Sequence, residues 1–373
     1  MPPSTGLLTP SKLTKRLILK LLSTQPQTAS VDHAEGFATT VVIRKPYLLF
    51  LGEATHFSQA KTAFGLRDWA PESCVGQWSL PGCAVSLELA EMNPAQAAAK
   101  GAGSLLIGIA PVGGRVSESW IPSLFAGIEA GLDIVSGMHT SLADIPGLAD
   151  AAKARGVRLV DVRRPPENLP TGTGRKRSGK RLLTVGTDCA LGKKYTALAL
   201  TKALRDRGVD ADFRASGQTG ILIAGSGIPM DAVVADFTAG AAECLSPDAA
   251  PNHWDIVEGQ GSLFHPAYAG VTLGLVHGSQ PDAMVLCHDP YRTHIIAAPD
   301  FPTPTLKVAI KQYEEAAQLT NPDARVVGIS FNTSALTDAE RTKLFADTEK
   351  ELGLPCFDPL KTSMTAVVDR MLG

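Results

Sequence analysis

A glycine-rich segment, residues 186–194, contains the residue types that bind phosphate groups. It follows an apolar run at residues 182–185 and leads into residues 197–204, whose apolar spacing is that of a helix. Glycines let backbone N–H groups converge on an anion, and a helix N-terminus and a lysine add positive charge. The predicted ligand-binding residues are Gly186, Thr187, Asp188, Cys189, Gly192, Lys193, Lys194 and Thr196.

This segment differs from the common phosphate-binding loop in two ways. Five residues instead of four separate Gly186 from Gly192, and Lys194 stands where a hydroxyl residue normally holds magnesium. A site that loses a Mg²⁺ ligand and gains a cation is suited to holding phosphates rather than cleaving them. Thr187 and Thr196 remain possible hydroxyl ligands, so magnesium-dependent chemistry stays open.

A second polar segment, residues 214–220, follows an apolar run at residues 209–213. Arg214 can bind a carboxylate through two hydrogen bonds, and Gln218 can both donate and accept. Because the segment comes directly after the phosphate-binding unit, we expect it to reach the same edge of a parallel sheet and bind an acidic or amino-acid substrate. A turn with an exposed arginine is the alternative.

A carboxylate between glycines, Glu258, ends the apolar run at residues 255–257. Proteins with a phosphate-binding loop keep an acidic residue there, where it faces the phosphates or orders a water. Glu258 is therefore the first candidate for a general base, with a water or metal ligand and a structural acceptor as alternatives. His265, His277 and His288 fall at predicted loop starts; His265 and His288 are the secondary catalytic candidates, although a lone histidine is more often structural.

Asn332 follows a predicted strand at residues 325–331. Its amide could read the edge of adenine, so we include it among the cofactor-binding candidates. An Asx turn or a cap on the following helix is an equally good interpretation.

The composition is that of an ordinary soluble protein: 373 residues, 44% hydrophobic and 19% charged, enough for two domains. A net charge of -2 gives no reason to expect nucleic acid as a partner, and no apolar run is long enough to cross a membrane. The six cysteines form no C-x-x-C pair, so we expect free thiols in the cytoplasm and no structural metal site.

Short apolar runs alternate with helical stretches from about residue 40 onward, which predicts parallel βαβ units and an α/β fold. We expect a Rossmann-like parallel sheet domain at residues 41–165, a linker at residues 166–180 and a P-loop α/β domain at residues 181–373. The linker is rich in proline, glycine and charge, and is interpreted as a solvated hinge. Residues 1–40 are interpreted as a weakly ordered basic extension, with a targeting or membrane-surface segment as the alternative.

The expected elements of both domains can be given by residue number. Strands are predicted at residues 47–51, 104–109, 133–136, 158–162, 182–185, 209–213, 255–257, 283–287, 325–331 and 356–357, and helices at residues 95–100, 123–130, 147–155, 197–204, 337–352 and 363–371. Polar or glycine-rich groups follow three strands of the first domain, which makes a cleft there plausible. These groups are Glu53, Thr55 and His56, then Gly113, Gly114 and Arg115, then Gly137 and His139.

The second domain resembles the dethiobiotin-synthetase-like branch of P-loop proteins in residues 186–193 and in the strand end at residues 257–259. From about Lys45 onward, the chain is similar to a family long catalogued as a domain of unknown function, which includes the D-glutamate N-acetyltransferases. The strings that carry this closer resemblance are residues 45–52, 217–220, 258–266, 274–279 and 281–288.

The resemblance implies acetyl transfer from acetyl-CoA to the amine of D-glutamate, as a step in D-glutamate catabolism. Acetyl-CoA would be a co-substrate whose phosphates are held but not cleaved, and no metal is expected. A base, Glu258 or one of the two candidate histidines, would activate the amine, and backbone N–H groups of residues 259–262 would stabilise the oxyanion. Arg214, Gln218, Gln260 and Ser279 are the expected substrate-binding residues. A homo-oligomer is expected as for many metabolic enzymes.

Two other functions remain as alternatives at this point. One is an ATP- and magnesium-dependent ligase or kinase like dethiobiotin synthetase, and the other is a nucleotide-sensing module. Within the acetyltransferase, Cys189 could in principle carry the acetyl group, but a small buried residue is the preferred interpretation because no base is adjacent to it.

Overall fold

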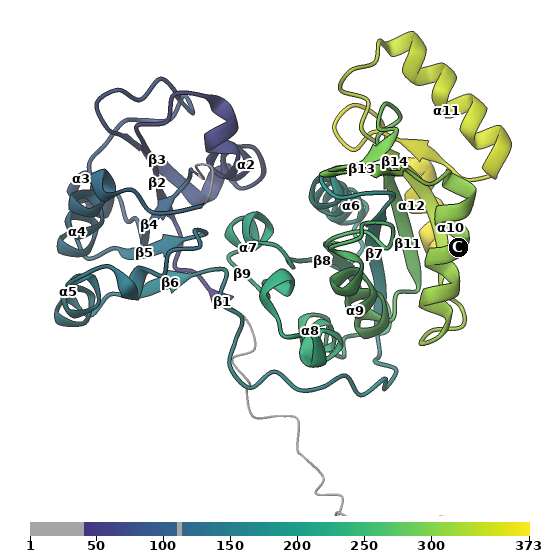
Figure 1. The fold of residues 1–373 in the computed structure, drawn as a ribbon, viewed down its shortest axis with the longest axis horizontal. Coiled ribbons are helices and arrows are strands. Elements are labelled where there is room, and N and C mark those ends of the chain that lie inside the picture. Colours follow the sequence, from purple (N-terminus) through teal and green to yellow (C-terminus); the bar gives the residue numbers. More distant parts are fainter. Residues whose placement is uncertain (1–40, 110–113) are drawn as a thin grey trace, which may run out of the picture. The chain divides into compact units, whose positions relative to one another are not determined.

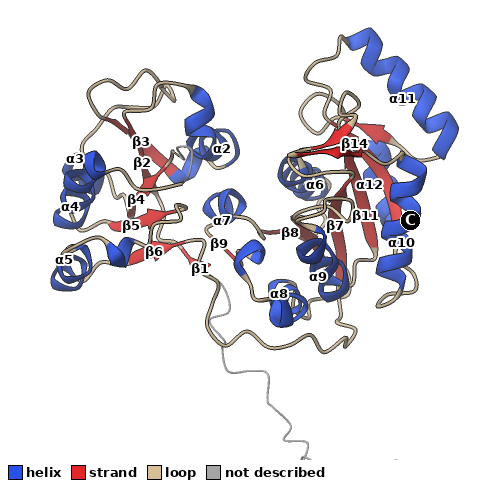
Figure 2. Ribbon diagram, viewed as in Figure 1, coloured by secondary structure: helices blue, strands red, loops and turns tan. Residues whose placement is uncertain are grey.

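The computed structural model describes residues 41–109 and 114–373, which form two parallel sheets with helices packed against them (Figures 1 and 2). The expected α/β fold is thereby confirmed. The predicted extension at residues 1–40, and Gly113 of the predicted strand-end loop, lie outside the described residues. No helix of the described segments is long and apolar enough to cross a membrane.

The first sheet has five parallel strands in the order β3-β2-β4-β5-β6. The chain order reverses between β2 and β4, and ligands of such doubly wound sheets bind beyond the carboxyl ends of the strands near such a reversal. The strands are β2 (Tyr47–Gly52), β3 (Cys74–Ser79), β4 (Ser104–Ile107), β5 (Asp133–Ser136) and β6 (Leu159–Asp161). The helices are α2 (Lys61–Trp69), α3 (Pro94–Ala99), α4 (Ile121–Glu129) and α5 (Leu148–Arg155).

The second sheet has six parallel strands in the order β15-β14-β11-β7-β10-β8. Strand β7 is central, with apolar side chains on both faces buried, as in strands covered by helices on both sides. The strands are β7 (Lys180–Gly186), β8 (Ala211–Arg214), β10 (Trp254–Val257), β11 (Ala283–His288), β14 (Arg325–Phe331) and β15 (Cys356–Phe357). The helices are α6 (Lys193–Asp206), α7 (Gln218–Ala224), α8 (Thr238–Leu245), α9 (Ala269–Ser279), α10 (Leu306–Gln318), α11 (Asp338–Leu352) and α12 (Thr365–Leu372).

Two small antiparallel pairs complete the architecture. Strand β1 (Val41–Val42) pairs with β9 (Ser226–Gly227), and β12 (His294–Ile295) pairs with β13 (Ala298–Pro302). The β12–β13 pair follows β11 and thus lies near the carboxyl edge of the second sheet. There the N–H of Ile296, between the two strands, donates to Asp188.

Helix α7 packs into the hydrophobic core of the first sheet although it follows β8 of the second. Its apolar residues Ile221, Leu222 and Ile223 belong to the same buried cluster as the side chains of β2. The hydroxyl of Tyr47 donates to the carbonyl of Leu222 at 3.1 Å. Because α7 begins at Gln218, this packing fixes the polar start of the helix between the two sheets.

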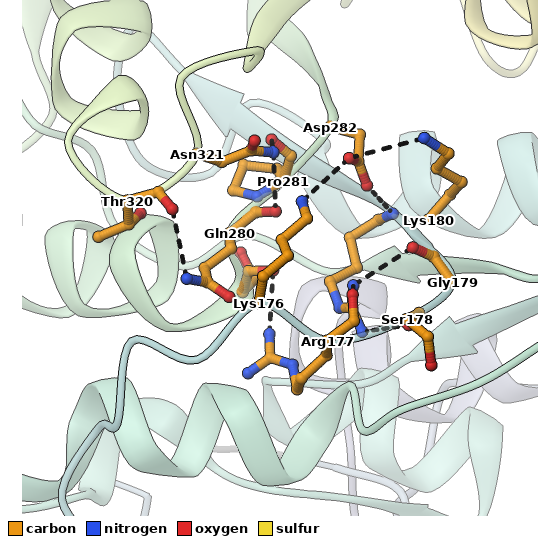
Figure 3. Close-up of polar contacts among 12 residues, drawn as sticks. Lys176, Arg177, Ser178, Gly179, Lys180, Gln280, Pro281, Asp282, Thr320 and Asn321 are labelled. Carbon is orange, nitrogen blue, oxygen red and sulfur yellow. Dashed lines mark hydrogen bonds and ion pairs between the residues drawn. The ribbon is translucent and has the colours of Figure 1, made fainter. Parts of the chain in front are cut away.

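Near the end of the predicted linker, Arg177 is buried although residues 171–176 before it are exposed, so the chain is anchored by the burial of this one residue (Figure 3). Arg177 is 5% exposed and donates to the carbonyls of Gly278 at 2.7 Å and Ser279 at 3.1 Å. Lys176 forms an ion pair with Asp282 at 3.2 Å. These bonds hold the chain against the amino ends of the second sheet's strands before β7 begins.

The predicted strands and helices each match an observed element within a few residues. Residues 218–220, predicted as part of a polar loop, instead begin α7, and His277 lies in α9 rather than at a loop start. Strand β3 and helices α2, α8, α9 and α10 were not predicted from the sequence. Glycines interrupt the periodic pattern in β3, α2, α8 and α9, whereas α10 has a clear amphipathic pattern that could have identified it.

Candidate active site

A cleft of about 1000 Å³ lies beside the phosphate-binding loop, residues 187–192. The loop, the start of α6, the start of α7, residues 258–261 and the start of α9 supply most of its lining. Lys61, His139 and Arg163 add side chains from the Rossmann-like domain. The cleft is therefore built where the carboxyl ends of strands from both sheets converge, as expected for α/β folds.

Lys193 is the first residue of α6, and its side chain reaches back to the phosphate-binding loop. Gly192 has φ 101°, which a residue with a side chain rarely adopts, and this turn directs the chain into α6. The Lys193 ammonium donates to the carbonyl of Asp188 at 2.9 Å, and burial lowers its pKa. A lysine held under the loop at the start of a helix is positioned to contact bound phosphate.

Asp188 is fully buried and fixes the shape of the loop. Its Oδ1 accepts from the N–H of Cys189 at 2.6 Å, and its Oδ2 accepts from Arg292 at 3.0 Å and from the N–H of Ile296 at 2.7 Å. Arg292 was not predicted from the sequence. The carboxylate has its acceptors engaged by protein donors, so Asp188 supports the loop rather than facing the cleft.

Asp188, Cys189 and His265 lie within 4.8 Å of one another through one candidate ligand atom each. His265 Nδ1 accepts from the N–H of Ala267 at 3.1 Å, and its Nε2 faces the carbonyl of Ile296 at 3.0 Å. Backbone groups therefore already engage both imidazole nitrogens, and Asp188 is bound to Arg292. This cluster has the distances of a metal site but its donors are committed to structure.

The two candidate hydroxyl ligands of magnesium point away from the cleft. Thr187 Oγ1 is 2.9 Å from His288 Nδ1, and Thr196 Oγ1 is 2.7 Å from Ser330 Oγ. Both threonines are buried, and neither contributes to the cleft lining. Their hydroxyls stabilise the contacts of β7 and α6 with β11 and β14.

Glu258 is 4% exposed and lies in the cleft lining. Its Oε2 accepts from the N–H groups of Ser216 and Gly217, each at 3.0 Å, whereas Oε1 accepts no hydrogen bond from the described part of the chain. Burial raises its pKa to about 7, against the opposing effects of Lys194 and these two N–H groups. A carboxylate with one free oxygen and a pKa near neutrality has the properties of a general base.

Lys194 also lines the cleft and acts electrostatically on Glu258. Its ammonium lies 4.5 Å from the centre of the Tyr195 ring, and burial lowers its pKa. Tyr195 in turn stacks on Trp69 of α2, with ring centroids 5.9 Å apart. Lys194 is thus held between the loop and the Rossmann-like domain, where its ammonium can interact with an anion bound in the cleft.

The other two catalytic candidates do not line the cleft. His265 is held by backbone groups as described above. Burial lowers the pKa of His288 to about 4, so its imidazole is neutral at pH 7 and interacts with Thr187. The structure brings Glu258 alone of the three candidates to the cleft.

The predicted substrate-binding residues divide into two groups. Gln218 and Gln260 line the cleft. Arg214 is instead paired with the buried Asp255 and with Asp212 at 3.5 Å, because β8 and β10 are neighbours in parallel register. Ser279 is fully buried at the end of α9, at the opposite edge of the sheet beside Arg177.

Asn332 is absent from the cleft lining, and its Oδ1 accepts from the N–H of Ser334 at 3.2 Å. This is the Asx turn that the sequence analysis gave as one of its two interpretations. Cys189 and Gly192 of the predicted loop residues do line the cleft.

Sequence reasoning missed Lys61, Arg163 and Asp231 among the lining residues. Arg163 lies two residues after β6, at the carboxyl end of a parallel strand, and this position was the signal that could have identified it. The basic, proline-rich residues 163–166, at the boundary between the predicted domain and the predicted linker, made this signal hard to recognise.

Comparison with known families places these two domains in one family. A model described as the P-loop domain of DUF1611, a domain of unknown function, matches residues 169–368, and its Rossmann-like N-terminal counterpart matches residues 74–165. A crystal structure of a DUF1611 family protein from Anabaena variabilis has a TM-score of 0.76 and 34% identity, covering 88% of this chain and 99% of that chain.

Two curated relatives share a name. A D-glutamate N-acetyltransferase of Tritonibacter scottomollicae is 49% identical over 330 residues, which are 88% of this chain and 99% of the relative. Another of the same name, from Pseudoalteromonas sp, is 48% identical over 326 residues, 87% of this chain and 98% of the relative.

Proposed function

The chain belongs to the DUF1611 family, and on this basis we propose that it is a D-glutamate N-acetyltransferase. The reaction moves the acetyl group of acetyl-CoA to the amine of D-glutamate. Relatives of that name match nearly their whole length at 48% and 49% identity, which supports a common activity.

The observation that carries the proposal is the pairing of the phosphate-binding loop with Glu258 in one cleft. Transfer to an amine needs a group that removes a proton from the ammonium before attack. Glu258 has a free oxygen, and its pKa of about 7 suits a base at neutral pH.

The phosphates of CoA fit the loop chemistry. Lys193, Lys194 and the start of α6 supply positive charge, and the cleft volume of about 1000 Å³ suits a nucleotide-sized molecule. The hydroxyls of Thr187 and Thr196 are engaged elsewhere, which favours holding phosphate over magnesium-dependent cleavage.

The chemical step uses residues around Glu258. The carboxylate accepts a proton from the substrate ammonium, and the free amine attacks the thioester carbon. The C–S bond then breaks, the proton still carried by the attacking nitrogen passes to the CoA thiolate to give the thiol, and Glu258 releases its proton to solvent.

The N–H of Gly259 already donates to Thr184 Oγ1 at 2.9 Å. Of the other expected donors, Gln260 and Gly261 line the cleft and Ser262 does not. The N–H groups of Gln260 and Gly261 make no hydrogen bond to the described residues and are the candidates to stabilise the oxyanion.

The cellular setting follows from the same proposal. We place the enzyme in the cytoplasm, in D-glutamate catabolism, and as a homo-oligomer. Its six cysteines are all free, which suits a reducing compartment.

The test is release of CoA thiol from acetyl-CoA with D-glutamate, L-glutamate or no acceptor, each with and without Mg²⁺ and ATP. We expect release that requires D-glutamate and needs neither Mg²⁺ nor ATP. The Glu258→Gln variant controls for non-enzymatic thiolysis, since it keeps the loop but lacks the base. Magnesium-dependent ADP formation without acetyl transfer would establish the ligase or kinase alternative instead.

A further inference from the structure

We propose that Arg163 binds a carboxylate of the acceptor amino acid. In the absence of substrate the Arg163 guanidinium pairs with Asp231, and the substrate carboxylate takes the place of the Asp231 carboxylate. This inference rests on the proposed function, because it concerns how the acceptor of the acetyl group is recognised. Arg163 therefore takes the anchoring role that the sequence suggested for Arg214.

Arg163 stands where two cavities meet. Together with His139 it lines both the main cleft and a neighbouring pocket of about 220 Å³. That pocket also contains Arg164 and Asp161, and it lies beyond the carboxyl ends of β5 and β6. An amino acid in this pocket would project toward the cleft that contains Glu258 and the phosphate-binding loop.

The contacts of Arg163 come from the P-loop domain. Its Nη2 pairs with Asp231 Oδ2 at 2.9 Å. In the amide orientation that satisfies both of its neighbours, Gln218 accepts from Arg163 Nη1 at 3.2 Å and donates to the carbonyl of Gly137 at 2.6 Å. Gln218 thus orients the guanidinium, while Asp231 supplies the carboxylate that a substrate would mimic.

The two arginine–aspartate pairs beside the cleft differ in how readily they can open. Arg163 and Asp231 have side chains that are 24% and 38% exposed, and such partly exposed ion pairs contribute little net stability. Arg214 pairs with Asp255, which is 1% exposed, and opening that pair would leave a buried charge. Exchange of partners is therefore feasible at Arg163 and unfavourable at Arg214.

The charges of the residues that line the cleft and the neighbouring pocket are complementary to those of a dicarboxylic amino acid. Lys61 and Arg163 supply positive charge on the side of the Rossmann-like domain, where Arg164 is paired with Asp161 at 3.7 Å, and Glu258 lies on the side of the P-loop domain. D-glutamate carries two carboxylates and one ammonium, so its carboxylates suit the first group and its ammonium suits the second.

The experiment compares Arg163→Gln, Arg163→Lys, Asp231→Asn and the Arg163→Gln/Asp231→Asn double variant of the full chain. Arg67→Gln is the control, because Arg67 forms a pair with Asp68 at 2.6 Å of similar exposure, 32% and 50%, outside the cleft lining. We would measure KM for D-glutamate and for acetyl-CoA, calorimetric binding of D-glutamate alone, and Tm to confirm folding.

We expect Arg163→Gln to raise KM for D-glutamate about 10- to 100-fold, the effect of one charge-assisted hydrogen bond, and to change KM for acetyl-CoA less than about twofold. Arg163→Lys should recover part of the loss. Asp231→Asn should lower KM for D-glutamate about 2- to 5-fold with Arg163 present and have no effect without it, which a merely structural pair would not produce.

An unchanged KM for D-glutamate in Arg163→Gln, or an equal rise in Arg67→Gln, would overturn the inference while leaving the acetyltransferase intact. Binding of D-glutamate without acetyl transfer in the wild type would overturn the proposed function, and the binding constants of Arg163→Gln would still decide the role of Arg163. A wild type that neither binds nor acetylates D-glutamate would overturn both.

Discussion

The two edges of the second sheet both hold charged groups that are shielded from water, but they use them differently. At the amino edge, Arg181 is 1% exposed and donates to five backbone carbonyls, those of Arg177, Ser178, Gly179, Ser246 and Pro247. At the carboxyl edge, Glu258 is 4% exposed and keeps one carboxylate oxygen without a hydrogen bond from the described residues.

This difference distinguishes buried charged groups that support the fold from buried charged groups that can act on a ligand. A buried ion whose hydrogen-bonding capacity is filled by backbone holds the fold and has nothing left to offer a ligand. A buried ion with unused capacity, facing a cleft, carries a shifted pKa and can exchange partners.

The largest expected effect is at Glu258. The Glu258→Gln variant keeps the shape and the two backbone hydrogen bonds but cannot accept a proton. We expect kcat/KM for D-glutamate to fall about 100- to 10,000-fold, the usual contribution of a general base, with KM for acetyl-CoA nearly unchanged. A variant with wild-type turnover would show that the base lies elsewhere.

Substitution of Arg181 should lower the stability of the protein and leave its activity unchanged, the reverse of what is expected for Glu258. Arg181→Met leaves five buried backbone carbonyls without their donor, so the free energy of unfolding in urea should fall by about 3 to 5 kcal/mol. The activity of the remaining folded protein should be unchanged. Lys180→Met, which loses only an exposed ion pair with Asp282, is the control and should cost less than about 1 kcal/mol.

The stability of the protein should depend on the pH through Glu258. Its carboxyl has a pKa of about 7 when folded and an ordinary value of 4.5 when unfolded, so the folded state retains the proton over this interval. The contribution of this carboxyl to the free energy of unfolding is therefore fully present below pH 4.5. It is lost, by on the order of 3 kcal/mol, as the pH rises to 7. Urea titrations at pH 5 and pH 8 should show this loss in the wild type and not in Glu258→Gln.

The absence of a side chain at Gly220 should be needed to keep the Glu258 carboxylate in place. A Cβ at this position of α7 would overlap the Glu258 carboxylate. We expect Gly220→Ala to lower kcat/KM about 10- to 100-fold by displacing the base. If the glycine acts only in this way, Gly220→Ala should add no further loss to Glu258→Gln, and an additive loss would indicate a separate role.

The smallest effect is expected at Cys189. Burial raises the pKa of its thiol, which disfavours the thiolate needed to carry an acetyl group. Cys189→Ala should therefore keep kcat within about threefold of the wild type. Loss of activity, together with an acetylated Cys189 in the mass spectrum of the wild type, would establish a covalent relay.

The sequence identified the elements and residues whose evidence is local. The phosphate-binding loop follows from a strand, glycines, a lysine and a helix within about 20 residues, and Glu258 follows from a carboxylate at a strand end. Such patterns need no knowledge of distant partners, and both segments line the observed cleft.

Residues whose role depends on distant partners could not be assigned in this way. Arg214 meets Asp255 through the pairing of β8 with β10, and His265 meets the carbonyl of Ile296 from β12–β13. Arg163 reaches the cleft because α7 is anchored in the first core and brings Gln218 to it. None of these neighbours is visible in the order of residues along the chain.

The burial of α7 in the first core has a consequence for modularity. The two halves of this protein are not interchangeable parts, because a fragment starting after residue 166 would present Ile221, Leu222 and Ile223 to water and lose the hydroxyl of Tyr47. Gene splitting, or recombination that swaps one half for that of a distant relative, would succeed only if the helix and the sheet that receives it were exchanged together.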